Sequence, residues 1–171
     1  MYNIYIQINN LATSEIDQLG VIMFDAVRKG TTEFYSSKQR QAWVPKIPSG
    51  ASWAARLASQ KIVVARKAER PIGFMTLDKN GYIEFAFVAS EHQRQGIGGY
   101  LYTRIEALAH KSNLESLHSQ ASYLGRRLFE QQGWEVIHAQ QIERDGTTLT
   151  NFLMEKHLKS GDRAHLFQPK A

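Results

Sequence analysis

Residues 82–101 read YIEFAFVASEHQRQGIGGYL, a strand pattern followed by a polar corner and a glycine run that opens a helical pattern. The first seven residues are rich in aromatic and β-branched types and alternate as a strand does. Three glycines follow, starting at Gly96, and glycine lets the backbone take unusual dihedrals and approach a ligand closely. The free N–H groups of a first helical turn suit a phosphate or pyrophosphate. This stretch therefore predicts an anion-binding corner between a strand and a helix.

The spacing of the glycines argues against two common phosphate loops. A dinucleotide fingerprint G-x-G-x-x-G starting at Gly96 would need a glycine where Leu101 stands. A P-loop would need Gly-Lys-Ser or Gly-Lys-Thr, which the chain does not contain. The motif that remains is Q-x-x-G-x-G at residues 93–98. Glycine corners after strands are also often simple tight turns, so the motif needs support from the rest of the chain.

Composition narrows the class of protein. The chain has 171 residues, of which 43% are hydrophobic and 22% charged, values that suit one globular domain. We expect this domain to cover residues 1–158 and the polar residues 159–171 to form a loose tail. Cysteine is absent, which excludes disulfides and thiolate metal sites, and the six histidines lack a paired ligand spacing, so no metal is expected.

The charge and hydropathy of the chain indicate where the protein is located in the cell and which partners it binds. The net charge is +5 with the basic residues scattered, so we expect no nucleic-acid partner. No secretory leader is recognisable and no run of about 18 apolar residues occurs. We therefore expect a cytoplasmic protein that does not bind a membrane.

The periodicity of the whole chain predicts a mixed α/β fold. Strands are expected at residues 2–7, 61–66, 71–77, 82–88, 114–119, 134–139 and 149–154. Helices are expected from a cap at Thr13 or Ser14 to about Gly30, and at residues 36–43, 49–59, about 97–110 and 121–132. Three antiparallel strands thus precede the glycine corner. A helical crossover then makes the strand at 114–119 parallel to the strand at 82–88.

Two motifs and this element order resemble the GNAT acetyltransferase superfamily. Gln93–Gly98 resembles the coenzyme A pyrophosphate loop of that family, and Leu128–Trp134, LFEQQGW, resembles its late helix ending in aromatic-Glu-x-x-Gly-aromatic. The similarity runs from Ile4 to His157 and is to small bacterial single-domain members. It implies a mostly antiparallel sheet of six or seven strands, helices on both faces, and a splayed parallel strand pair that holds acetyl-CoA.

The resemblance also implies an activity and a cofactor site. The activity is acetyl transfer from acetyl-CoA to a primary amine of a small molecule or peptide, by direct attack in a ternary complex. In this family the loop N–H groups bind the pyrophosphate, the strand edge bonds the pantetheine, and the Val88 N–H would polarise the thioester carbonyl. The implied cofactor-binding residues are Phe87, Val88, Gln93, Arg94, Gln95, Gly96, Ile97, Gly98, Gly99, Ser122 and Phe129.

The chain departs from the family pattern at the general acid. Glu84 is the candidate general base, because it lies four residues before Val88 on the same face of the strand; the alternative is an ordinary solvated or salt-bridged strand residue. Many family members have a tyrosine acid where this chain has Phe129, and an asparagine where it has Ser122. Tyr123 is the nearest phenol and the candidate acid, with protonation of the thiolate by solvent as the alternative.

The early helices flank the cofactor sulfur in the family, so the acceptor slot is expected there. Tyr35, Trp43 and Glu84 are the candidate acceptor-binding residues, and Trp53 is a further candidate for the slot; the alternative is that the tryptophans only pack helices onto the sheet. The missing tyrosine at Phe129 keeps open a second function, a non-catalytic sensor or regulatory domain that binds CoA or acetyl-CoA. The final strand pair offers an edge for a homodimer.

Overall fold

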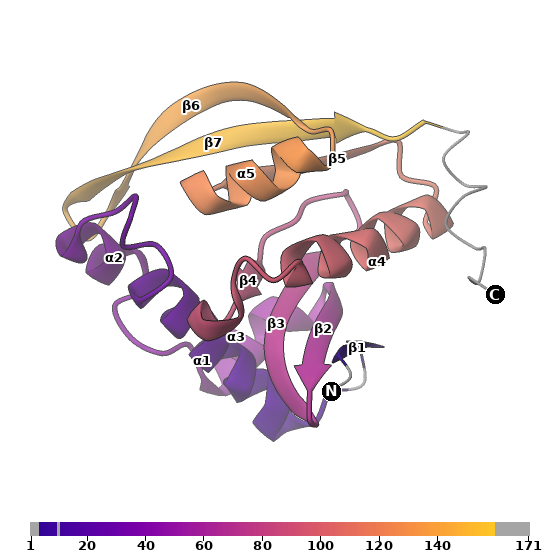
Figure 1. Cartoon of the computed structure of the whole chain (residues 1–171), viewed down its shortest axis with the longest axis horizontal. Helices are drawn as coiled ribbons and strands as arrows, with labels where there is room; N and C mark the ends of the chain where they lie inside the picture. The colour runs from indigo at the N-terminus through magenta and orange to yellow at the C-terminus, as the bar shows by residue number, and fades with distance from the viewer. Residues whose placement is uncertain (1–3, 10, 160–171) are drawn as a thin grey trace.

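The computed structural model describes residues 4–9 and 11–159 of the chain (Figure 1). The predicted tail lies outside these residues except for Lys159, as do the first two residues of the predicted first strand. The strands are β1 (Ile4–Ile8), β2 (Lys61–Lys67), β3 (Arg70–Leu77), β4 (Ala86–Val88), β5 (Ser116–Ala121), β6 (Glu135–Arg144) and β7 (Thr147–His157). The helices are α1 (Thr13–Arg28), α2 (Ser37–Trp43), α3 (Gly50–Ala58), α4 (Ile97–Lys111) and α5 (Tyr123–Gln131), with a 3-10 turn at Ser90–His92.

The described strands form two antiparallel sheets, in the orders β1-β2-β3-β4 and β5-β7-β6. A parallel bridge between Tyr82 and His118 connects them, with the Ile83 N–H donating to the His118 carbonyl at 3.0 Å. Beyond this bridge β4 pairs with β3 while β5 pairs with β7, so the parallel neighbours separate. The mixed α/β fold and the splayed strand pair are confirmed; the predicted single sheet is two sheets that meet at one bridge (Figure 1).

The predicted strand at residues 82–88 is regular only in β4, because side chains bind its backbone at the point of separation. The Phe85 N–H donates to the Thr76 hydroxyl oxygen at 3.2 Å, while the Thr76 N–H donates to the Phe85 carbonyl at 2.9 Å. The Ser119 hydroxyl donates to the Ile83 carbonyl at 2.8 Å. These bonds satisfy buried backbone groups where the ladder is interrupted, as a buried chain requires.

Helices cover both faces of the first sheet. Alternating residues of β2 and β3, such as Val63 and Met75, join the core with α4, α5 and β7. Their neighbours Val64 and Phe74 join the core with α1 and α3. Trp53 belongs to this second core: its indole N–H donates to the Ile16 carbonyl at 2.8 Å and only 4% of it is exposed. The expectation that Trp53 lines the acceptor slot is therefore wrong.

Two element boundaries differ from the sequence predictions for local reasons. Helix α1 begins after Ala12, whose N–H donates to the Glu15 carboxylate at 2.8 Å, so neither Thr13 nor Ser14 is the cap. The last hairpin is longer than predicted, because the polar residues on both sides of the turn at Asp145 continue the ladder between β6 and β7. Strand β6 lies at the outer side of its sheet, and a homodimer through that edge stays a prediction.

Candidate active site

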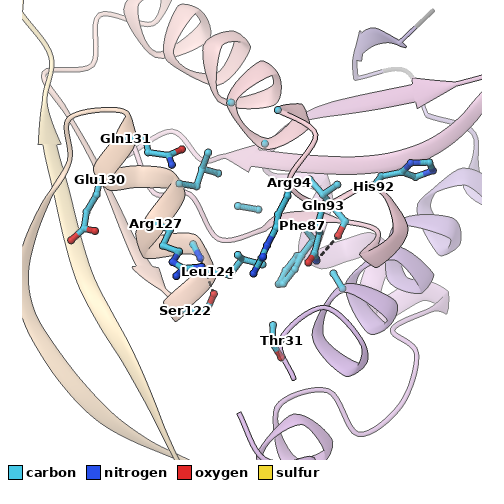
Figure 2. A pocket seen from close by; sticks show the side chains of 18 of the residues that line it. Thr31, Phe87, His92, Gln93, Arg94, Ser122, Leu124, Arg127, Glu130 and Gln131 are labelled. Carbon is cyan, nitrogen blue, oxygen red and sulfur yellow. Dashed lines mark hydrogen bonds between the residues drawn. The ribbon is translucent and has the colours of Figure 1, made fainter. Parts of the chain in front are cut away.

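The separation of β4 from β5 opens a cavity of about 910 Å³ between β4, the loop before α4, and α5. Figure 2 shows side chains from these elements gathered around the same space. Eight of the residues predicted to bind the cofactor line it: Phe87, Val88, Gln93, Arg94, Gly96, Gly98, Gly99 and Ser122. The volume lies in the range typical of cofactor pockets, roughly 300 to 1,000 Å³.

Alternate residues of β4 direct their backbone N–H and C=O groups away from β3, toward the cavity. Phe87 is paired with Phe74 of β3, and the Ala89 N–H donates to the Ile72 carbonyl at 2.9 Å. In an antiparallel ladder the polar backbone groups alternate between the two sides of a strand. The backbone groups of Ala86 and Val88 therefore face the cavity, whereas the Ala89 N–H is already bound. Of Phe87, Val88 and Ala89, only Val88 offers its N–H to a ligand.

The glycine corner has the geometry of an anion site. Gly96 precedes α4 at φ +80°, a left-handed conformation that favours glycine. The Tyr100 N–H makes the first bond within the helix, to the Gly96 carbonyl at 3.0 Å. The N–H groups of residues 97–99 therefore lack partners within the helix and lie at its positive end. A Cβ at Gly98 would stand 3.2 Å from the Leu128 side chain, so glycine allows α4 to approach α5 closely.

Two arginines approach the cavity from opposite elements. Arg94 extends from the loop and forms an ion pair with Glu33 at 2.8 Å, and Arg127 extends from α5 with its guanidinium 5.2 Å from the Phe34 ring. Both side chains point into the space between loop and helix in Figure 2. The sequence shows Arg126 and Arg127 as a basic pair but does not distinguish them. In the structure Arg126 is bound to Glu130 at 2.8 Å and only Arg127 lines the cavity.

Three predicted cofactor residues do not line this cavity. Gln95 is exposed, and its amide donates to the Glu91 carbonyl at 3.0 Å. The side chain of Ile97 is buried in the core, so only its N–H is placed to contact a ligand. Phe129 stacks on Trp134 with ring centroids 4.4 Å apart and faces a second cavity.

The second cavity, of about 160 Å³, adjoins the first. The residues that line both are Trp43, Ala86, Phe87, Ser122 and Gly125. The three predicted acceptor residues, Tyr35, Trp43 and Glu84, all line the second cavity. Because the two cavities share walls at β4 and at the start of α5, a group held in each would meet there.

Glu84 is both salt-bridged and part of this cavity. Its Oε1 accepts from the Arg56 guanidinium, with Nε at 2.7 Å, and its Oε2 accepts from the Gln60 amide. An ionised carboxylate offers about four lone-pair sites. Two contacts at Oε1 and one at Oε2 leave Oε2 able to accept one further N–H or O–H.

Tyr35 and Tyr123 connect the segment before α2 to β7 and to the start of α5. The Tyr35 hydroxyl donates to the Thr150 carbonyl at 2.7 Å and accepts from the Tyr123 N–H at 3.3 Å. Burial raises the pKa of Tyr35 to about 12, so it stays neutral at ordinary pH. The Tyr123 ring packs against Phe34, Tyr35 and Phe152, with centroids 5.0 to 5.6 Å away. Tyr123 is not among the residues that line either cavity.

The described part of the chain contains no cluster of three or more His, Asp or Glu side chains arranged to hold a metal ion. Within the same residues, no helix has both the length and the apolar character needed to cross a bilayer.

Comparisons with known proteins agree with this geometry. The acetyltransferase (GNAT) domain family matches residues 31–157. The uncharacterized N-acetyltransferase YafP of Escherichia coli (strain K12) is 32% identical over 149 residues, covering 87% of this chain and 94% of YafP.

Solved structures show the same fold at lower identity. A GCN5-related N-acetyltransferase from Rhodopseudomonas palustris superimposes with a TM-score of 0.82 at 24% identity, covering 89% of this chain and 95% of that one. A GNAT superfamily phosphinothricin acetyltransferase from Sinorhizobium meliloti, solved with acetyl-CoA, has a TM-score of 0.68 at 16% identity, covering 90% and 88%. Together with the match over residues 31–157 and the likeness to YafP, these findings show that the chain belongs to the GNAT acetyltransferase family and is an N-acetyltransferase.

Proposed function

We propose that the chain transfers an acetyl group from acetyl-CoA to a primary amine of a small molecule or peptide, by direct attack in a ternary complex. The observation that carries this proposal is that the large cavity at the glycine corner and the small cavity at Glu84 share walls. Direct transfer needs the two reactants held side by side, and two adjoining cavities meet that requirement. The related acetyltransferase from Sinorhizobium meliloti was solved with acetyl-CoA, which supports the choice of acyl donor.

The residues around the large cavity fit coenzyme A. The unpaired N–H groups at residues 97–99 suit its pyrophosphate, and the guanidinium groups of Arg94 and Arg127 suit its negative charge. The open edge of β4 offers backbone groups to the amides of the pantetheine arm. Gln93 supports this edge, because its side-chain amide donates to the Val88 carbonyl at 3.0 Å.

Bound acetyl-CoA supplies the acyl group and the thiolate leaving group. At the shared wall the amine nitrogen forms a new C–N bond while the C–S bond breaks. The Val88 N–H donates to the carbonyl oxygen, where negative charge develops. Glu84 takes the proton that the amine must lose, through the free site on Oε2 or through a water.

The thiolate takes its proton from solvent in this proposal. Phe129 has no proton to donate, and the Tyr123 ring is packed among other aromatic rings. A thiol has a pKa of about 8.5, so a thiolate leaves without strong help from an acid.

Two measurements test the proposal. Titration calorimetry with acetyl-CoA should show binding, and a thiol-release assay across a panel of primary amines should show CoA formation with at least one of them. Failure to bind at 1 mM acetyl-CoA, the upper end of typical KM values of roughly 1 μM to 1 mM, would overturn the cofactor assignment. Binding without CoA release for any amine would favour the sensor function instead.

A further inference from the structure

The small cavity carries charged and polar groups whose arrangement indicates what kind of amine it binds. Its apolar part is formed by side chains such as Phe129, Ile142 and Leu149, and its polar part includes Glu84, Arg56 and Arg144. Water occupies about 30 Å³ per molecule in the liquid, so a cavity of about 160 Å³ admits a small acceptor or the reactive end of a larger one.

The two guanidinium groups at this cavity are not equivalent. Arg56 is bound to Glu84, with Nε 2.7 Å from Oε1, so these charges compensate one another. The side chain of Arg144, near the tip of the β6–β7 hairpin, has no ion-pair or hydrogen-bond partner within residues 4–9 and 11–159. The hairpin is held over the cavity by the Tyr35 hydroxyl at Thr150 and by the Gln39 amide, which donates to the Thr148 carbonyl at 3.1 Å. Arg144 therefore places an uncompensated positive charge at the wall of the acceptor cavity.

Tyr82, another residue of this wall, lies close to the same charges. Burial raises its pKa first, Glu84 raises it further, and the charges of Arg56 and Arg144 lower it. The Glu84 carboxylate and the Arg144 guanidinium line the same small cavity as Tyr82.

A second observation comes from Asn151 of β7, which also lines the cavity. Its Oδ1 is buried and has no hydrogen-bond partner among the described residues. Leaving a buried acceptor without a partner destabilises the fold, so such a group in a folded protein calls for an explanation, and a bound ligand is one. The amide oxygen is suited to accept an N–H from the amine.

We propose that the acceptor is a small amine that also carries a carboxylate, such as an amino acid, with Arg144 binding the carboxylate and Asn151 Oδ1 accepting an N–H of the amine. This inference rests on the proposed function. An arginine binds a carboxylate through charge-assisted hydrogen bonds that are often bidentate. The amine would then lie toward Glu84 and the shared wall, with the carboxylate toward the hairpin.

The test compares three acceptors that differ only at the carboxylate: leucine, leucinamide and isoamylamine. In the thiol-release assay we expect kcat/KM for leucine to exceed that for leucinamide by roughly tenfold to a hundredfold, as a charge-assisted contact predicts. Arg144→Gln should reduce this ratio to about one. Arg104→Gln, an exposed arginine of α4 whose guanidinium is 5.9 Å from the Tyr100 ring, is the matched control and should keep the ratio.

Asn151 has a different expected signature. Asn151→Ala should lower kcat/KM for all three acceptors by a similar factor, because the amine is common to them. A selective loss for leucine alone would show that Asn151 does not bind the amine and would overturn that part of the proposal.

A binding experiment separates this inference from the proposed function. With the protein saturated with CoA, which has no acetyl group to transfer, calorimetry should show tighter binding of leucine than of leucinamide. Equal binding, or equal turnover of leucine and isoamylamine, would overturn the carboxylate proposal while leaving acetyl transfer intact. Absence of CoA release for every amine, with tight leucine binding retained, would overturn the proposed function and keep the carboxylate site.

Discussion

Glu84 is salt-bridged and also lines the small cavity, and its proposed role as the base stays a prediction. Its position four residues before Val88 suggested either a salt-bridged strand residue or a base. The structure places Glu84 in an ion pair with Arg56, and both residues line the small cavity. An ion pair that is partly exposed adds little to stability, about 0–1 kcal/mol at the surface. We therefore expect its removal to affect the reaction more than the fold.

Replacing Glu84 tests the base directly. We expect Glu84→Gln to lower kcat by roughly 10²- to 10⁴-fold, the usual contribution of a general base. Glu115→Gln, an exposed glutamate before β5, is the control. Thermal unfolding of both variants should stay close to the wild type. An unchanged rate and pH profile in Glu84→Gln would show that another group, or water alone, takes the proton.

Tyr123 was the candidate acid, and its aromatic surroundings lead to the opposite expectation. Because its ring packs against Phe34 and Phe152 and lines neither cavity, Tyr123→Phe should change kcat by less than about twofold, since acid catalysis by a positioned side chain contributes about 10²–10⁴-fold. Steady-state kinetics with the best acceptor measures this. A loss of a hundredfold or more would restore the phenol as the proton donor.

Arg127 is one of the residues of the large cavity that sequence reasoning missed. Without an anionic partner among the described residues, its guanidinium is available to a phosphate. We expect Arg127→Gln to weaken acetyl-CoA binding by roughly tenfold and to make the affinity less sensitive to salt, because one screened charge interaction is removed. Arg126→Gln, whose side chain is bound to Glu130, is a matched control on the same helix. Equal losses in the two variants would indicate a general charge effect.

At the scale of elements, the glycine corner places the N-terminus of α4 at the end of β4. Gly96 is required for its conformation, at φ +80° with open space around a notional Cβ, so any cost of substitution arises in the backbone. Gly99 is helical, and its nearest neighbour would stand 3.7 Å from an added Cβ. Gly96 is therefore needed for the backbone conformation of the corner, whereas Gly99 occupies an ordinary helical position.

This difference can be measured. Gly96→Ala should reduce the free energy of unfolding by about 1–2 kcal/mol, the usual strain of a left-handed residue with a Cβ. Gly99→Ala should be neutral or slightly stabilising, because alanine favours helix. Chemical denaturation without ligand measures both. Equal effects in the two variants would contradict the assignment of the corner conformation to Gly96.

Whether a segment is a helix or a strand could be predicted where apolar residues recur at a regular spacing. The residues at which elements begin and end could not be predicted as well. The periodicity after Gly96 predicted a helix at about residues 97–110, and α4 covers Ile97–Lys111. Helix α5 begins two residues later than expected, because Ser122 is its N-cap. The strand at 82–88 was expected to be continuous. Its interruption depends on the hydroxyls of Thr76 and Ser119, which reach its backbone only after the two sheets have assembled.

At the scale of the molecule, the two sheets meet at the parallel bridge between Tyr82 and His118 and separate beyond it, where β4 pairs with β3 and β5 with β7. The Tyr35 hydroxyl joins the early helices to β7 and to the start of α5, so it fixes the wall of the acceptor cavity. Its burial raises its pKa from 10.0 to about 12. The folded state thus favours the protonated phenol, which contributes stability that is fully present below pH 10.

A pH series tests this. We expect Tyr35→Phe to be less stable than the wild type by about 1–3 kcal/mol at pH 8, since two buried backbone groups lose their partner. The difference should shrink as the pH rises from about 10 through about 12, where the wild-type phenol ionises. Denaturant unfolding at intervals across this range measures it. A difference independent of pH would show that the hydroxyl is not buried in the folded state.

The sequence by itself determined the class of protein, because its information is local. Strand alternation, the glycine spacing and the LFEQQGW motif depend on neighbouring residues, and they were sufficient for the mixed fold, the glycine corner before α4 and the family. Only the tertiary structure decided which side chains share a cavity. Arg144 and Asn151 lie more than 100 residues from Tyr35, and separation of β4 from β5 beyond a single bridge brings all three to the wall that also holds Glu84. No periodic pattern encodes that arrangement, since it arises from the way two sheets are joined at one bridge.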